Sequence, residues 1–295
     1  MDFRIETFLA ACEHMNFSRA AEALCITQPA VSQHIQYLER EYGVKLFRKE
    51  GKRIYLTGEG RILRETMAVI KNDEQIMRER MRECGSGKRE LSFGVTMTIG
   101  EYTLLAPLAA YLKAHPERNV RVRYGNTAKL EEELREGSID FALVEGYFRK
   151  EAYDSLRFDT EQFIPVCAAA HSFLREPHSL RDLVGERLIL REPGSGTRNI
   201  LERSLAVKGL SVQDFQRRTE IENMHTIIGL LERDCGISFL YRVAVRDQLL
   251  RGTLRELLLE DFKLEHDFAF IWPRGSAFRE DYHAISEELR GYREL

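Results

Sequence analysis

Residues 16–43 carry two short helical patterns joined by a capping residue and a proline, a feature that strongly limits how the N-terminus can fold. The stretch reads NFSRAAEALCITQPAVSQHIQYLEREYG. We expect Ser18 to cap the first helix and Thr27 the second, because a hydroxyl oxygen can accept from the unpaired N–H groups of a first turn. Pro29 fits that turn, where a missing N–H costs nothing. A third helical pattern precedes the pair, with apolar residues at Ile5, Phe8, Leu9 and Cys12.

The second helix of the pair has an apolar face and a polar face. Its apolar stripe is predicted to face a core and consists of Val31, Ile35, Leu38 and Tyr42. The opposite face offers amide and hydroxyl groups that can pair with base edges, and small side chains that can touch a thymine methyl. Its candidate DNA-binding residues are Pro29, Ala30, Ser32, Gln33 and Gln36. A glutamine-rich face that is only solvated is the alternative for an isolated helix.

The segment VKLFRKEGKRIYLT, which follows, predicts a hairpin with a tight tip. From Lys45 to Arg53 it holds five basic residues and one acid, five minus one giving a local charge of +4. Such a wing suits phosphate contacts beside an inserted helix, and its candidates are Arg48, Lys52 and Arg53. Residues 1–60 as a whole contain eight Lys or Arg and eight Asp or Glu. A single neutral copy should bind DNA weakly, so two or more copies are expected on each site.

A long helix is predicted from Thr57 to about Glu83, and it offers a way to bring copies together. Apolar residues recur every seven positions at Leu63, Ile70 and Met77, next to Met67 and Met81. A neighbouring stripe contains Ile62, Val69 and Ile76. This much apolar surface favours a dimerisation seam over packing within one chain. CGSGKRE, Cys84 to Glu90, is then expected to be a hinge.

The ordered set S-R-A-A-E-A-L, T-Q-P-A-V-S-Q-H-I-Q-Y-L-E, G-V-K-L-F-R and L-T-x-x-G, from Ser18 to Gly60, resembles the winged helix-turn-helix of LysR-type transcriptional regulators. The resemblance implies a DNA-binding domain (1–60), a linker and dimerisation helix (57–84) and an effector-binding domain (85–295) shaped like a periplasmic binding protein, assembled as a homodimer or homotetramer. The resemblance also implies that Gln28, Pro29, Ser32 and Gln33 contact bases and that Arg53 is the wing contact. It therefore adds Gln28 to the candidate residues of the helix face.

Beyond Leu91 the pattern changes to strands that alternate with helices, which predicts a multidomain α/β chain with a two-lobed C-terminal part. Lobe I is expected at about 91–162 and 266–295, and lobe II at about 163–265. The predicted strands are LSFGV, VRVRY, IDFALVE, RLILRE, RTEIE, GISFLY and HDFAFIW. The predicted helices are Tyr102 to His115, Ala128 to Glu136, one after Gly196, one from Asn223 and one from Phe278 to about Arg293. A cleft between the lobes is the expected place for a small ligand.

Three loops are predicted to meet at that cleft. VTMTIG supplies two hydroxyls and free N–H groups, REPGSGTRN starts a helix whose dipole favours an anion, with Arg198 adding charge, and ENMHT starts another helix. The candidate effector residues are Thr96, Thr98, Ile99, Gly100, Gly194, Ser195, Gly196, Thr197 and His225. The family resemblance agrees for Thr96, Thr98, Ser195 and Thr197, and REPGSGTR is similar to members whose effectors are often small anions. Glu145 departs from this pattern: it either repels an anion, selects one with an amino group, or faces solvent.

The remaining composition narrows the class of protein. The N-terminus lacks a signal-peptide layout and no long apolar run is present, so a cytoplasmic location and no membrane partner are expected. The five cysteines are dispersed and predict reduced, mostly buried thiols and no metal site. An enzyme acting on a small anion is disfavoured because G-x-S-x-G, G-x-G-x-x-G and H-x-x-x-H are missing. No cofactor is expected. A thiol-based redox regulator using Cys167 and Cys235 remains the alternative, although their apolar surroundings favour inert core thiols.

Overall fold

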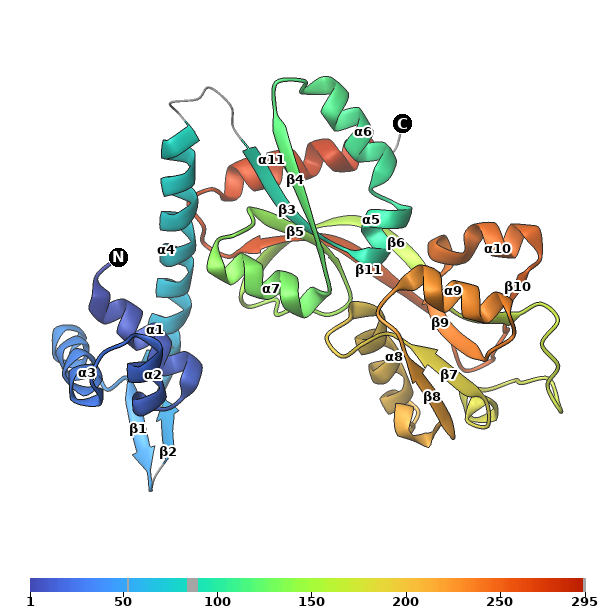
Figure 1. Ribbon diagram of the computed structural model, residues 1–295, viewed down its shortest axis with the longest axis horizontal. Helices are drawn as coiled ribbons and strands as arrows, with labels where there is room; N and C mark the ends of the chain where they lie inside the picture. Colours follow the sequence, from blue (N-terminus) through green and yellow to red (C-terminus); the bar gives the residue numbers. More distant parts are fainter. Residues whose placement is uncertain (52, 84–89, 294–295) are drawn as a thin grey trace.

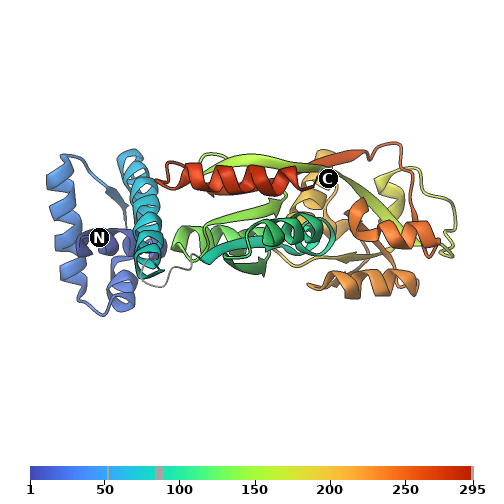
Figure 2. The ribbon, with the colours of Figure 1, turned by 90° about the horizontal axis from the view of Figure 1, so that it is seen from above.

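The computed structural model describes residues 1–51, 53–83 and 90–293. It contains a small helical head, one long helix and a larger two-lobed region (Figure 1). The head stands at one end of an elongated molecule, and the long helix lies between it and the two lobes (Figure 2). Among the described residues, no helix combines the length and apolar character needed to cross a membrane.

The head packs three helices and a hairpin around one apolar core. Its elements are α1 (Phe3–His14), α2 (Phe17–Ala23), α3 (Gln28–Tyr42), β1 (Phe47–Glu50) and β2 (Arg53–Leu56). The predicted stripe of α3 is confirmed at Val31, Ile35 and Leu38, which are buried. Its last member, Tyr42, is 43% exposed. The prediction that Tyr42 faces the core was wrong, because α3 ends there and Gly43 turns the chain away in a left-handed conformation.

The caps of the helix pair differ in part from the prediction. Thr27 caps α3 as predicted, and its side chain accepts from the N–H of Ala30. The cap of α2 is Asn16, whose Oδ1 accepts from the N–H groups of Ser18 at 2.9 Å and Arg19 at 3.1 Å. Ser18 lies inside the helix, so its predicted capping role was wrong. An asparagine two residues earlier reaches the same first-turn donors equally well.

The linker helix α4 (Gly58–Glu83) matches its predicted span closely. Its C-terminal half packs against lobe I: Ile76 is 3% exposed within the large core, Asn72 donates to the carbonyl of Leu134, and Asp73 accepts from the Ser276 hydroxyl at 2.7 Å. Ile76 therefore packs within its own chain, contrary to the prediction for that stripe. Other apolar residues of the helix remain exposed, namely Ile62, Ile70, Met77 and Met81. The predicted hinge, Cys84 to Glu90, lies outside the described residues except for Glu90.

One mixed sheet runs through both lobes. Its strand order is β4-β3-β5-β11-β6-β9-β7-β8, and β10 pairs with β6. The strands are β3 (Glu90–Thr96), β4 (Asn119–Gly125), β5 (Phe141–Glu145), β6 (Tyr153–Ala168), β7 (Arg187–Leu190), β8 (Arg217–Glu220), β9 (Ile237–Tyr241), β10 (Leu254–Glu256) and β11 (Leu264–Pro273). All seven predicted strands are present. The 16-residue β6 was missed over most of its length, because its exposed and buried residues do not alternate strictly.

Helices cover the sheet in both lobes. They are α5 (Met97–Tyr102), α6 (Leu105–Ala114), α7 (Thr127–Glu136), α8 (Gly196–Val207), α9 (Met224–Glu232), α10 (Arg246–Arg251) and α11 (Arg279–Gly291). The helix predicted from Tyr102 to His115 is present as α6, but its predicted start was wrong: α5 ends at Tyr102, and α6 begins at Leu105 with Pro107 in its first turn. Proline is tolerated in a first turn and breaks a helix interior, which explains the division.

Lobe I is defined here as β3–β5, α5–α7 and α11, and lobe II as β7–β9 and α8–α10. The two lobes are joined by β6 and β11, which pair antiparallel along their lengths. At one end β11 pairs with β5 of lobe I, and further along β6 pairs with β9 of lobe II. The strands β3 and β5 are parallel, as are β7 and β9, so each lobe has a parallel core flanked by the shared antiparallel pair.

Candidate functional site

Glu145, the last residue of β5, lies at the junction of the two lobes with its carboxylate held by three threonine hydroxyls. Thr96 donates to Oε2 at 2.6 Å, and Thr98 donates to Oε1 at 3.2 Å. Thr197, from the other lobe, donates to Oε1 at 2.9 Å. All four residues are buried, and Glu145 is only 1% exposed. We call this set of three donors the threonine cradle.

Local structure explains why these groups meet. Thr96 ends β3 and Thr98 lies in the following helix α5, while Thr197 lies in the first turn of α8. The backbone of lobe II comes against β5 at Gly196, where an added Cβ would lie 2.3 Å from the carbonyl oxygen of Glu145. Only glycine permits this approach. The predicted strand-end loops from the two lobes therefore do meet.

The electrostatic surroundings of Glu145 include one buried cation. Burial raises the pKa of the carboxyl, while the threonine hydroxyls and the Arg191 guanidinium oppose that rise. Arg191 is 4% exposed, and its Nε donates to Glu192 at 2.8 Å. Its Nη1 and the Ser195 hydroxyl are buried and have no hydrogen-bond partner within the described chain. The junction thus holds more polar donors than Glu145 engages.

The other predicted effector residues take different positions. Ser195 is buried at the N-cap of α8, and Gly194 has a left-handed φ of 91°. Ile99 is fully buried, and Gly100 lies under the ring of Tyr124. The His225 side chain is 70% exposed and its Nε2 lies 3.4 Å from Glu101 of lobe I. His225 therefore faces the rim of the junction rather than the cradle.

The structure decides two points about charge in this region. Of the alternatives for Glu145, the solvent-facing one does not apply, because β5 ends inside the junction. Arg198 does not point its charge at the cradle: it pairs with Glu202 at 2.8 Å and with Glu220 at 2.6 Å. The buried cation is Arg191, which sequence reasoning missed. Its position directly after the buried strand β7, ahead of the glycine loop, was the available signal.

Further contacts hold the lobes against each other. The amide of Asn126 in lobe I donates to Glu192 at 3.2 Å, and the N–H of Ala128 donates to the carbonyl of Gly194 at 3.4 Å. Together with the Thr197–Glu145 hydrogen bond, these contacts keep the junction between the lobes closed. The predicted anion position is filled by the chain's own carboxylate.

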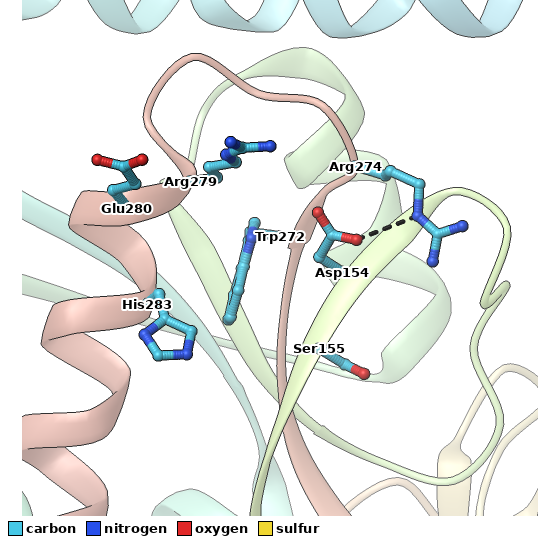
Figure 3. Close-up of a pocket in the computed structure, with 7 residues that line it drawn as sticks. All are labelled: Asp154, Ser155, Trp272, Arg274, Arg279, Glu280 and His283. Carbon is cyan, nitrogen blue, oxygen red and sulfur yellow. Dashed lines mark hydrogen bonds and ion pairs between the residues drawn. The ribbon is translucent and has the colours of Figure 1, made fainter.

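A separate open pocket of about 550 Å³ lies on lobe I (Figure 3). It is bordered by β6, β11 and the start of α11, and in Figure 3 Arg274 reaches across to Asp154, which it pairs with at 3.1 Å. Its lining residues are Asp154, Ser155, Trp272, Arg274, Arg279, Glu280 and His283. The predicted effector residues are not among them.

The candidate DNA-binding surface combines the start of α3 with the β1–β2 hairpin. Gln28, Pro29, Gln33 and Gln36 are exposed, while Ala30 and Ser32 are half-buried. The Gln28 amide donates to the Ser32 hydroxyl at 2.8 Å, which leaves these two side chains prearranged on one edge of the helix.

The hairpin forms as predicted, with Phe47 opposite Leu56 and Glu50 opposite Arg53. In the wing, Arg53 is exposed, and Arg48 pairs with Glu50 at 2.9 Å. Lys52 lies outside the described residues.

The two cysteines of the redox alternative have different environments. Cys167 is fully buried, and burial raises the pKa of its thiol to about 11, which disfavours the reactive thiolate. Cys235 is exposed, so its predicted core position was wrong; it lies in the turn that precedes β9. Cys25 is also exposed. Within the described residues, no group of three or more His, Cys, Asp or Glu side chains could hold a metal ion.

Two family models match the chain and together cover most of it. Residues 4–61 match the model described as "Bacterial regulatory helix-turn-helix protein, lysR family". Residues 85–293 match the model described as "LysR substrate binding domain".

Known proteins are similar over most of the chain or over its C-terminal domain. The HTH-type transcriptional regulator CysL of Bacillus subtilis is 31% identical over 269 residues, which cover 90% of this chain and 89% of that protein. A hydrogen peroxide-bound OxyR mutant of Corynebacterium glutamicum has a similar fold, with a TM-score of 0.60 at 21% identity, covering 99% of this chain and 92% of that one. The regulatory domain of CcmR from Synechocystis, in complex with 2-PG, matches with a TM-score of 0.61 at 17% identity, covering 70% of this chain and 97% of that domain.

Proposed function

Because the chain belongs to the LysR family and is a DNA-binding transcriptional regulator with an effector-binding domain, we propose that its effector is a small anion that binds between the two lobes. The observation that carries this proposal is the threonine cradle. Three hydroxyl donors from both lobes converge on one buried carboxylate. A site built to hold a carboxylate has the donors and the nearby cation that a small oxyanion requires.

The residues proposed to contact the effector are those nearest the cradle: Thr96, Thr98, Ser195, Gly196 and Thr197. The unpaired Ser195 hydroxyl and Arg191 Nη1 support the proposal, since buried polar groups without partners are costly unless a ligand or water satisfies them. The exposed His225 would contact only a ligand that extends to the rim.

The proposed mechanism couples the junction to DNA through a change in the angle between the lobes. An effector that binds one angle better than another shifts the population of the two states, and it can shift it only by that difference in affinity. A homodimer or homotetramer would convert the new angle into a different spacing or bend of its DNA half-sites. We place the DNA contacts at the start of α3, for base edges, and at Arg48, Lys52 and Arg53 of the wing, for phosphates.

A ligand screen on the full chain tests the effector class. Small carboxylates, phosphates and sulfur oxyanions are added at equal ionic strength, and the Tm is measured for the wild type, for Ser195→Ala and for the control Ser204→Ala. Ser204 lies in the same helix and bonds only to the carbonyl of Ile200 in the described structure. An anionic effector should raise the Tm of the wild type and the control more than that of Ser195→Ala.

The hits are then added to operator fragments that the full chain has selected from random DNA. An effector should change the apparent Kd or the DNA bend. If the wild type is stabilised by no anion, or only by neutral or cationic compounds, the anionic class is wrong.

A further inference from the structure

The threonine cradle is already occupied, and its occupant is a side chain of the same chain. The Glu145 carboxylate uses both oxygens and accepts from three hydroxyls in two lobes. A carboxylate offers about four acceptor positions, so this one is nearly saturated by the cradle. It is also 1% exposed, and Thr96, Thr98 and Thr197 are each at most 2% exposed, so a second anion cannot contact the hydroxyls from solvent in this closed arrangement.

We infer that Glu145 is a resident surrogate ligand: its carboxylate holds the lobes closed in the position of the effector, and a small oxyanion binds only by displacing it. This inference rests on the proposed anionic effector and specifies how the same site is regulated.

Charge and shape both favour displacement over joint occupancy. Two anions within one buried site repel each other strongly, because little water is present to screen them. A cationic ligand is disfavoured, because the Glu145 carboxylate oxygens already accept from hydroxyls and the Arg191 guanidinium is a cation nearby. An oxyanion with three or more oxygens could take the three threonine donors. It could also engage donors that Glu145 leaves unused, at Ser195 and Arg191.

The position of Thr197 gives displacement a consequence for the lobes. Thr197 is in α8 of lobe II, whereas Thr96 and Thr98 follow β3 of lobe I. The surrogate therefore bridges the lobes, together with the Asn126–Glu192 and Ala128–Gly194 contacts, so the junction is closed without effector. A ligand that replaces Glu145 has a different size and number of oxygens, and it resets the distance between the lobes.

Chemical rescue tests the inference directly. The full-length Glu145→Ala variant lacks the Cγ methylene and the carboxylate, and acetate supplies a methyl and a carboxylate of the same size. We expect acetate to raise the Tm of Glu145→Ala by about 3 to 5 °C at ten times its Kd, relative to chloride at equal ionic strength, and to leave the wild type unchanged. Adding Thr197→Val to Glu145→Ala should abolish the rescue.

Asp159→Ala is the matched control. It also removes a buried carboxylate, but one that pairs with Arg293 instead of the cradle. Acetate that stabilises both alanine variants equally, or stabilises neither, would overturn the inference.

A second variant covers the case in which Glu145→Ala does not fold. Glu145→Gln keeps the volume and removes the charge, so sulfate should raise its Tm more than it raises that of the wild type. Equal sulfate shifts in the two proteins would contradict a displaced carboxylate. The outcomes distinguish the surrogate role of Glu145 from the anionic effector. If acetate rescues Glu145→Ala but no anion changes operator binding, Glu145 is a surrogate and the effector is not an anion. If an anion changes operator binding but acetate does not rescue Glu145→Ala, the effector is an anion and Glu145 is not a surrogate.

Discussion

At the scale of single residues, the side chain with most influence on this site is a carboxyl that the fold has removed from water. Desolvation alone would make a buried carboxylate costly. Here three hydroxyls and one guanidinium compensate for part of that cost. The pKa of Glu145 still lies above its ordinary value, so burial is the larger effect.

That raised pKa predicts a pH dependence with a definite sign. A carboxyl that binds its proton more tightly in the folded chain than in the unfolded chain adds stability below its unfolded pKa. The contribution is lost as the pH rises through the folded pKa. We therefore expect the Tm of the wild type to fall relative to that of Glu145→Gln as the pH rises above the ordinary glutamate pKa of about 4.3. Thermal unfolding of both proteins over a pH series measures this difference, and Tm curves that stay parallel would contradict the assignment.

Gly196 provides a second prediction at this scale. A Cβ at this position would lie 2.3 Å from the Glu145 carbonyl oxygen and 2.9 Å from its Cγ, so Gly196→Ala must push the two lobes apart. We expect a lower Tm and a larger radius of gyration by small-angle scattering. Gly185→Ala is the control, since an added Cβ meets nothing within 4 Å there. If the two variants have the same Tm and radius of gyration, the junction accommodates the added methyl group without loss of stability.

At the scale of elements, α3 and the β1–β2 hairpin should contribute differently to DNA binding. Gln33→Ala is expected to relax base preference at one operator position, at a cost of about 1–3 kcal/mol for the preferred base. Arg53→Ala should weaken binding to all sequences alike and reduce the salt slope by about 1. Titrations of selected and mismatched operators at several salt concentrations distinguish the two patterns. If neither variant changes affinity, another surface reads the DNA.

The elements show which sequence signals predict structure well. The stripe Val31, Ile35 and Leu38 and the strand IDFALVE were predictable, because each has one dominant period or one continuous apolar run. The cap at Asn16 was not, since several neighbouring residues satisfy the same first-turn chemistry. The break before α6 had a signal in Pro107, which the prediction of one long helix overlooked. The threonines of the cradle were predictable from their strand-end and helix-start positions. Their partner was not, because a sequence does not tell which way the last side chain of a strand points.

At the scale of the whole molecule, we expect the N-terminal head, which is neutral overall, to bind DNA well only beside a second copy. The exposed apolar residues of α4 are the proposed contact, since Ile70 is 46% and Met77 44% exposed in the single chain. The double variant Ile70→Asp, Met77→Asp is expected to shift the protein toward monomer. Lys71→Asp, on an exposed polar position of the same helix, is the control. Sedimentation velocity measures the mass, and an unchanged oligomer would place the contact elsewhere.

The attachment of α4 to lobe I also determines what a single molecule can transmit. Asn72 and Asp73 bind groups of α7 and of the segment before α11, and Arg80 pairs with Asp281 of α11 at 2.8 Å, all within lobe I. These contacts fix α4 to lobe I, so a change in the angle between the lobes would move lobe II relative to α4 and lobe I together. In a single molecule, such a change would leave the orientation of α4 relative to lobe I unaltered. We therefore expect it to act on DNA only where lobe II also contacts a neighbouring subunit.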